Sequence, residues 1–388
     1  MSEVRVAGTG MTDFGRFPER TGRDLFAEAG LAALDDAGVD PGDVEHVFFG
    51  NFMGELAEHQ GHMGPLMAEA VGVNAPATRY EAACASSGVA VREAVRSVRT
   101  GESDVLLVGG TERMTNMGTA GATEGLSIAA DDLYEIRAGM TFPGAYALMA
   151  RAYFEEFGGD STDLAHVAVK NHEHALPNEH AQFRSAITVD QVLDAPRIAD
   201  PLGLYDSCPI TDGASAVVLV SEAFAERNGL DASVAVTGSG QGGDKLALQD
   251  REYFARTPAS TAAAEEAYAD AGITADDVEV AEVHDCFTIA EVLAIESLGL
   301  YDPGEGLGAA RRGETTRHGD VPVNLSGGLK AKGHPVGATG VAQLASITNL
   351  LTGTHARSPD VGDLRVGVAH NAGGTVASAT VHVLEVVA

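Results

Sequence analysis

Apolar residues occur along this chain in short runs, which alternate with longer stretches where they recur at helical spacing. The runs at 278–283 and 364–369 have the pattern of strands, and the stretches at 289–298 and 341–351 have that of helices. Strands that alternate with helices are typical of α/β proteins, whose helices cover parallel sheets. The pattern predicts an α/β fold built on parallel sheets.

The same order of elements occurs twice, which predicts an internal duplication. Residues 37–45 correspond to 271–279, because each follows an alanine-rich helical stretch and leads into an apolar strand. The Gly-Val-Ala at 88–90 corresponds to that at 340–342, and a helix and a strand follow each. Residues from about 115 to 245 interrupt this order. We expect two half-domains that face each other across one cleft.

The segment Asn324–Gly340 places His334 in a glycine-rich backbone, NLSGGLKAKGHPVGATG. Glycine lets the main chain come close to a ligand, and Pro335 fixes the backbone directly after the histidine. A phosphate-binding loop is the competing interpretation, but the order GxxxxGK[ST] and the strand-GxGxxG context are absent. A lone histidine in a loop is most often structural.

Cys84 stands at the head of a predicted amphipathic helix, among small residues. A helix N-terminus lowers the pKa of a thiol and offers free backbone N–H groups, both of which favour a nucleophilic thiolate. A buried cysteine at a tight contact is the competing interpretation. Two further groups, His284-Asp285-Cys286-Phe287 and His370-Asn371-Ala372-Gly373, lie where predicted strands give way to loops, the usual place for catalytic side chains in α/β proteins.

The composition limits the partners of the chain. Its net charge is −31, from 56 acidic and 25 basic residues, and such a surface repels nucleic acid and anionic membranes. Near 1 M salt the Debye length shrinks to about 3 Å, so the charge also suits a highly saline cytoplasm and a halophilic archaeon. No secretion signal or membrane span is apparent, so we expect a cytoplasmic protein.

The remaining cysteine and the clustered histidines are interpreted as structural. Cys84, Cys208 and Cys286 form no CxxC pair and no metal-ligand spacing, which fits reduced thiols. Cys208, in YDSCPITDG, is expected to be structural. The four histidines at 166–180 match no known ligand spacing, and we expect no metal.

At this point the chain resembles the thiolase family over essentially its whole length. The resemblance is carried by Cys84-Ala85-Ser86-Ser87-Gly88, by ADPLGLYDSCPITDGASAVVL at 199–219, and by the block 324–340 with its Gly-His-Pro. The motif His-Asp-Cys-Phe at 284–287 is similar to that of archaeal and sterol-carrier-type thiolases. The chain departs from the family where a Cys-x-Gly is expected, because residues 370–373 are His-Asn-Ala-Gly.

The resemblance implies the thiolase fold, with two duplicated half-domains in an α-β-α-β-α layering and an inserted loop domain that covers the cleft and holds coenzyme A. The expected divisions are 1–114 and 206–250 for the N-terminal half, 115–205 for the loop domain and 251–388 for the C-terminal half. No cofactor is expected beyond coenzyme A thioesters as substrates. A homodimer or tetramer is implied, with a small OB-fold, zinc-ribbon protein and hydroxymethylglutaryl-CoA synthase as potential partners.

The implied chemistry is acyl transfer through an acylated Cys84. His334 activates this thiol and, with His284, donates N–H groups to an oxyanion or enolate. Cys286 and His370 are both candidates for the base that takes the α-proton. The remaining site residues are the backbone N–H groups of Cys84 and Gly373 as a second oxyanion hole, and Ser326, Gly327 and Asn371 as substrate-binding residues.

The expected reaction is condensation of two acetyl-CoA to acetoacetyl-CoA and coenzyme A, or its reverse. The alternatives are a degradative 3-ketoacyl-CoA thiolase for longer chains, a ketoacyl-ACP synthase, and a non-catalytic lipid or acyl-CoA carrier or scaffold subunit. The pair His284 and Cys286 argues against the synthase. The presence of both Cys84 and His334 argues against a protein without catalytic activity.

Overall fold

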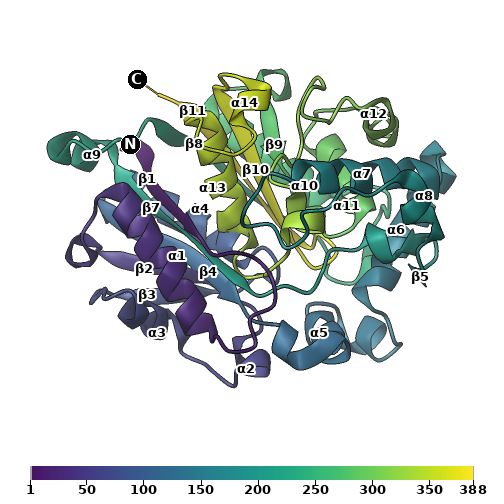
Figure 1. The fold of residues 1–388 in the computed structure, drawn as a ribbon, viewed down its shortest axis with the longest axis horizontal. Helices are drawn as coiled ribbons and strands as arrows, with labels where there is room; N and C mark the ends of the chain where they lie inside the picture. Colours follow the sequence, from purple (N-terminus) through teal and green to yellow (C-terminus); the bar gives the residue numbers. More distant parts are fainter. Residues whose placement is uncertain (1, 388) are drawn as a thin grey trace.

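The computed structural model describes residues 2–387 and consists of two halves with the same order of elements (Figure 1). The first half contains β1 (Val4–Met11), α1 (Gly22–Ala37), β2 (His46–Gly50), α3 (Met63–Ala70), β3 (Ala77–Tyr80), α4 (Ser86–Thr100), β4 (Val105–Glu112) and β7 (Gly213–Ser221). The second contains β8 (Val234–Gly243), α10 (Pro258–Ala271), β9 (Val280–Glu282), α13 (Thr339–Leu351), β10 (Val366–Gly373) and β11 (Ser378–Val386).

The strand order confirms the duplication. The strands form one sheet in the order β3-β2-β4-β7-β1-β8-β11-β10-β9, and Val323 makes an isolated parallel bridge beside β9. The first half thus reads β3-β2-β4-β7-β1, and the second reads Val323-β9-β10-β11-β8. The two halves meet where β1 pairs with β8, through Arg5 with Ala235 and Val6 with Val234.

The prediction of parallel sheets is wrong, because the sheet is mixed. β2 is parallel to β3 and β4, and β9 is parallel to β10, whereas the remaining strand pairs are antiparallel. β10 runs directly into β11 through a turn at residues 374–377, and a short turn can join only antiparallel strands.

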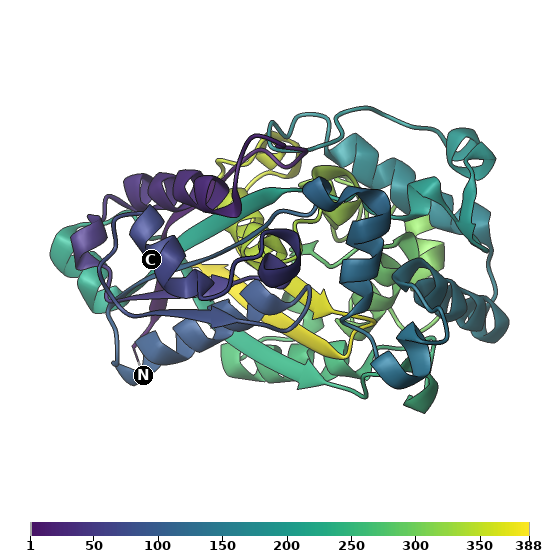
Figure 2. The same cartoon turned by 90° about the horizontal axis from the view of Figure 1, so that it is seen from below.

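The layers follow the predicted order α-β-α-β-α. Helices α4 and α13 share one apolar core with residues of both halves of the sheet, so they form the central layer. Helix α1 packs on β1 and β7 in a second core, and α10 packs on β8 and β11 in another. In Figure 2 the strands lie between these helices, and the two termini lie near one end of the molecule.

Glycine sets the distance between the outer helices and their strands. A Cβ on Gly10 of β1 would lie 2.1 Å from the Ala29 carbonyl oxygen of α1, and one on Gly240 of β8 would lie 2.0 Å from the Ala263 carbonyl oxygen of α10. Any side chain would therefore push the helix away from the sheet. The two halves solve this packing problem in the same way.

The helices between the repeated elements gather at the end of the molecule opposite β2 and β3 (Figure 1). They share an apolar core that joins the insertion to the second half. The elements of the insertion at 115–205 are α5 (Gly118–Ser127), α6 (Phe142–Phe157), α7 (Ser161–His174), α8 (Val189–Asp194), β5 (Arg197–Ala199) and β6 (Leu202–Gly203). Those of the second half are α11 (Thr288–Ser297) and α12 (Gly306–Arg312).

Short elements complete the fold. The short α-helices are α2 (Gly54–Ala57), α9 (Glu222–Asn228) and α14 (Ser358–Val361), and single π-helical turns span Asp132–Ile136 and Gly328–Lys332. Within residues 2–387, no helix has the length and apolar character needed to cross a membrane.

Candidate active site

A cavity of about 510 Å³ lies where the ends of the central helices meet the insertion. Helices α4 and α13 approach closely there, because a Cβ on Gly340 would lie only 2.4 Å from the backbone nitrogen of Gly88. These glycines belong to the repeated Gly-Val-Ala segments, so the duplication brings the two helix N-termini together. The cavity walls include Cys84, Tyr146, Cys286, Phe287, His334 and Gly374.

Cys84 reaches the cavity from a tight turn between β3 and α4. Ala83 adopts a left-handed conformation with φ of 51°, which is uncommon for a residue with a side chain. Ser86 secures the turn, since its hydroxyl donates to the Ala83 carbonyl at 2.5 Å and accepts from the Ala82 N–H at 3.0 Å. The thiol is half-buried and faces the cavity.

His334 is held through its backbone by Thr211 and through one ring nitrogen by Thr339, the first residue of α13. Its backbone N–H donates to Thr211 Oγ1 at 3.0 Å, and its Nδ1 lies 2.8 Å from Thr339 Oγ1. The Thr339 hydroxyl donates its hydrogen to the Pro335 carbonyl at 3.0 Å, so its oxygen accepts a hydrogen bond from the Nδ1–H of the histidine. This network assigns the proton to Nδ1 and leaves the lone pair on Nε2.

His284 follows β9 and presents the opposite tautomer. Its Nδ1 lies 3.1 Å from Nδ2 of Asn371, an amide donor, so Nδ1 accepts and Nε2 carries the proton. Nε2 is buried and has no hydrogen-bond partner in the protein. A buried donor without a partner is costly, and His284 lies beside Cys84 and His334, so a substrate oxygen bound there could accept it.

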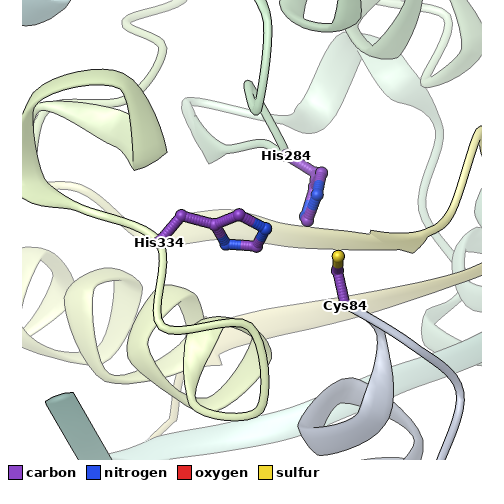
Figure 3. Close-up of side chains that lie close together, drawn as sticks. All are labelled: Cys84, His284 and His334. Atoms are coloured by element: carbon purple, nitrogen blue, oxygen red, sulfur yellow. The ribbon is translucent and has the colours of Figure 1, made fainter. Parts of the chain in front are cut away.

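The structure brings three of the predicted residues together (Figure 3). One donor atom each of Cys84, His284 and His334 lies within 4.8 Å of the others, and the two imidazole rings are nearly perpendicular with centroids 5.0 Å apart. The three come from different segments, before α4, after β9 and before α13. A sulfur and two nitrogens at this spacing could also hold a thiophilic metal ion.

The expectation of a thiol pKa lowered by the helix N-terminus is wrong. Burial raises the pKa of Cys84 to about 12, although the backbone N–H groups of Gly374 and Cys84 lower it. Burial also lowers the pKa of His334 to about 3. Both groups are therefore neutral in the resting site, and the proton must leave the thiol as the nucleophile attacks.

Cys286 also lines the cavity, as predicted, and two residues beside it were missed. Its carbonyl accepts the backbone N–H of Cys208 at 2.9 Å, and this pairing brings the Cys208 thiol into the cavity wall. Cys208 therefore lines the cavity, and its structural role stays a prediction. Tyr146 of α6 stacks on Phe287, with ring centroids 4.6 Å apart. No motif in the sequence indicated either neighbour, because both contacts depend on tertiary packing.

His370 does not reach the cavity, and its expected place in a loop is wrong. It lies within β10, paired with Val381, and its ring points toward α10. Its Nε2 is 2.8 Å from Ser260 Oγ, and its Nδ1 accepts the backbone N–H of His284 at 3.4 Å. Strand alternation explains this placement, since neighbours on a strand face opposite sides of the sheet. His370 thus supports the backbone of His284.

The remaining predicted residues also lie away from the reacting groups. Asn371 is in β10 and acts through His284. The N–H that contacts the Cys84 sulfur belongs to Gly374 rather than Gly373, which ends β10 one residue earlier. Ser326 is fully buried and hydrogen-bonds Glu282, and Gly327 packs on Ala175, so neither lines the cavity.

A buried polar network supports the loops that carry His284 and His334. Three of the four lysines of the chain, Lys170, Lys330 and Lys332, are buried. The Lys170 ammonium lies 3.0 Å from Glu291, and Asn171 donates to both Glu291 and Asp285. Buried charges of this kind are stable only when paired and hydrogen-bonded. The network therefore holds these two loops, and with them the two histidines, in place.

Comparisons with known proteins agree with this geometry. The model of the thiolase N-terminal domain matches residues 4–223, and that of the thiolase C-terminal domain matches residues 240–386. Acetyl-CoA acetyltransferase of Methanothermobacter thermautotrophicus is 42% identical over 384 residues, which cover 99% of each chain. The enzyme of the same name from Methanocaldococcus jannaschii is 39% identical over 394 residues, with the same coverage.

A solved structure entitled Ltp2-ChsH2(DUF35) aldolase is similar along the whole chain, with a TM-score of 0.82, 25% sequence identity, and coverage of 99% of this chain and 98% of that one. Fold, catalytic constellation and relatives agree. The chain belongs to the thiolase family.

Proposed function

We propose that this thiolase condenses two acetyl-CoA molecules to acetoacetyl-CoA and coenzyme A, or runs the reverse thiolysis. The observation that supports this most directly is the grouping of Cys84, His284 and His334, of which Cys84 and His334 line one cavity. The names of the methanogen relatives support acetyl-CoA as the substrate. The motif at 284–287 supports the archaeal or sterol-carrier-type branch of the family.

In the first half-reaction, His334 Nε2 takes the proton of Cys84 as the sulfur attacks the thioester carbonyl of acetyl-CoA. The carbonyl electron pair moves to oxygen, where the N–H groups of Cys84 and Gly374 are placed to receive it. When the tetrahedral intermediate collapses, coenzyme A leaves as a thiolate and takes the proton of Cys286. The products are acetyl-Cys84, protonated His334 and a Cys286 thiolate.

In the second half-reaction, the Cys286 thiolate takes an α-proton from a second acetyl-CoA. The enolate oxygen accepts N–H groups from His284 and His334, and such donors are worth roughly 3 kcal/mol each in comparable sites. The enolate carbon bonds to the acetyl carbon, and the bond from that carbon to the Cys84 sulfur breaks. The Cys84 thiolate regains its proton from His334, which restores the resting state.

The larger assembly is also a proposal. Residues 115–205 supply much of the cavity wall, including Phe142 and Pro143, and we assign them as the loop domain that covers coenzyme A, with divisions at 1–114, 206–250 and 251–388. The edge strand β3 has a free side, which supports a homodimer or tetramer. The ChsH2(DUF35) component named with the solved structure supports a small partner chain, and hydroxymethylglutaryl-CoA synthase is a further candidate.

The acidic surface supports a cytoplasmic enzyme of a halophilic host. With a net charge of −31, the melting temperature should rise between about 0.1 M and about 2 M KCl, because salt screens repulsion among surface carboxylates. A melting temperature that falls over this range would argue against a saline origin.

The function is tested by incubating the protein with acetyl-CoA labelled in the acetyl group, and measuring released thiol and label on the protein. We expect label on Cys84, release of coenzyme A and formation of acetoacetyl-CoA. Cys84→Ser should lose about four orders of magnitude or more in rate while keeping its fold, because a serine hydroxyl is a weak nucleophile at its ordinary pKa. Label on Cys286 instead of Cys84 would overturn the assignment.

A further inference from the structure

Tyr146 is a buried polar side chain of the cavity wall that the proposed mechanism does not use. It belongs to the second turn of α6. It is fully buried and lines the cavity. Its ring stacks on Phe287, the neighbour of Cys286 in the chain. Its hydroxyl donates to the carbonyl oxygen of Gly374 at 3.0 Å. The phenol is therefore held between the turn at Gly374 and the loop that carries Cys286.

The Cys286 thiol lines the same cavity and belongs to the residue before Phe287, the ring on which Tyr146 stacks. Interaction with the Tyr146 hydroxyl lowers the pKa of the thiol, and the thiol raises the pKa of the phenol. Burial keeps the pKa of Tyr146 well above its ordinary value, so the phenol retains its proton throughout. A phenol has one proton to donate, so it serves the Gly374 carbonyl or the sulfur, and an anionic sulfur is the stronger acceptor.

The other groups that face Cys286 oppose its ionisation. Burial raises the thiol pKa most, and Cys208, Cys84 and Asp285 raise it further. The imidazoles of His284 and His334 are neutral in the resting site, because burial lowers the pKa of both. Lys330 lowers the pKa of Cys208, and Arg251 faces Tyr146 rather than the thiol. Among these neighbours in the resting site, Tyr146 is the one that favours the thiolate. In the acetyl-enzyme, protonated His334 favours it as well.

We propose that Tyr146 is a positioning residue whose hydroxyl turns from the Gly374 carbonyl to the Cys286 sulfur when that sulfur becomes a thiolate. The inference rests on the proposed function, in which Cys286 gives its proton to departing coenzyme A and later takes one from the second acetyl-CoA. Tyr146 loses no proton in the cycle. Its hydrogen bond stabilises the anion between these two proton transfers, the period in which acetyl-Cys84 waits for its second substrate.

The same switch links the two thiols. In the resting site, Tyr146 holds Gly374, whose own N–H contacts the Cys84 sulfur. The Tyr146 hydroxyl therefore donates to the backbone beside Cys84 while that thiol is acetylated. It leaves the Gly374 carbonyl when negative charge appears on the Cys286 sulfur.

The test compares Tyr146→Phe with Tyr153→Phe. Tyr153 lies two turns further along α6, is equally buried, and donates to Glu296 at 2.5 Å, away from the cavity. Each variant removes one buried hydroxyl from the same helix, so loss of stability is matched. The measured quantity is incorporation of solvent deuterium into the methyl group of acetyl-CoA, followed from about pH 6 to pH 10, together with the rate of acetylation of Cys84.

For Tyr146→Phe we expect deuterium exchange to slow by about 10- to 100-fold near neutral pH, the range for loss of a hydrogen bond to a charged group. The exchange profile should shift to higher pH, with much of the lost rate recovered there, and Cys84 acetylation should fall less than exchange. In a Cys84→Ser, Cys208→Ser background, alkylation of Cys286 by iodoacetamide should need a correspondingly higher pH. Tyr153→Phe should leave both profiles in place.

The two possible failures differ. If the natural protein neither acetylates Cys84 nor exchanges methyl protons, the proposed function fails. If it does both, and Tyr146→Phe has the same exchange rate, exchange profile and alkylation profile as Tyr153→Phe, the role of Tyr146 is refuted while the function stands.

Discussion

The two halves of the chain share a backbone plan and differ in the side chains that it carries. Equivalent hydrogen bonds join the inner strands: the Glu45 N–H donates to the Val105 carbonyl at 2.9 Å, and the Glu279 N–H donates to the Val366 carbonyl at 3.1 Å. Both outer helices end at a left-handed glycine, Gly38 in the first half and Gly272 in the second. These bonds define which positions correspond.

The correspondence breaks at the cavity. Five residues after the donor glutamates stand Gly50 in the first half and His284 in the second, and five after the acceptor valines stand Gly110 and Asn371. A Cβ on Gly110 would lie 1.9 Å from the Gly337 carbonyl oxygen, and one on Gly50 would lie 2.5 Å from a backbone nitrogen of α4. The first half has no side chains there: Gly110 makes room for the segment that carries His334, and Gly50 makes room for the start of α4. The scaffold is duplicated, whereas the chemistry depends on asymmetry.

Apart from loss of the Cys84 nucleophile, the largest effect should come from Cys286, which belongs to the second half. Cys286→Ala should lose about 10²- to 10⁴-fold in exchange of acetyl methyl protons, because it removes the general base, while still forming acetyl-Cys84. His370→Ala should lose much less exchange and mainly lose stability, since its ring bonds Ser260 and the His284 backbone. Exchange is measured by deuterium incorporation, and acetylation by mass spectrometry.

Exchange that survives in Cys286→Ala and vanishes in His370→Ala would reverse the two roles. It would also mean that His370 takes part in the reaction, although its ring lies on the face of β10 that packs on α10.

The next effect tests the donor at the position where the first half has glycine. His284→Ala should lower kcat by about 10²- to 10³-fold, the usual loss for one oxyanion-hole donor, and should cost about 1–3 kcal/mol in stability because the buried Asn371 amide loses its acceptor. Its Nε2 has no hydrogen-bond partner in the protein, so no buried partner is left unpaired on that side. Steady-state thiolysis of acetoacetyl-CoA measures the loss. A kcat within a factor of three of the natural protein would rule out this role for Nε2.

Much of this arrangement could be predicted from the sequence, for identifiable reasons. The repeat, Cys84, His334, His284 and the position of Cys286 follow from local patterns and motifs, and the layering follows from the resemblance to the thiolase family. Strand direction could not be predicted, because the repeat gives the order of strands and says nothing of the turn between β10 and β11. The failures at the site have a similar cause.

The predictions that were wrong at the site concern properties that depend on burial and tertiary packing. The neutral state of Cys84 depends on enclosure by distant segments, which outweighs the helix N-terminus. The place of His370 depends on which face of β10 meets α10, and the contacts of Tyr146 and Cys208 depend on packing across the cavity. None of these properties leaves a periodic or motif signal in the sequence.

The smallest of the expected effects concerns how tightly the halves constrain each other. Gly110→Ala would force its Cβ against the Gly337 carbonyl, in the loop between His334 and Thr339 that fixes the tautomer of the histidine. We expect a loss of about 1–3 kcal/mol in free energy of unfolding, the usual cost of overpacking a well-packed contact. Gly243→Ala on β8 is the control, since its nearest atom is 3.8 Å from the added Cβ. Urea unfolding in one buffer measures both. Equal stability of the two variants would mean that Gly110 is not needed for close packing of the halves, and the asymmetry of glycine and side chain would then have no structural basis.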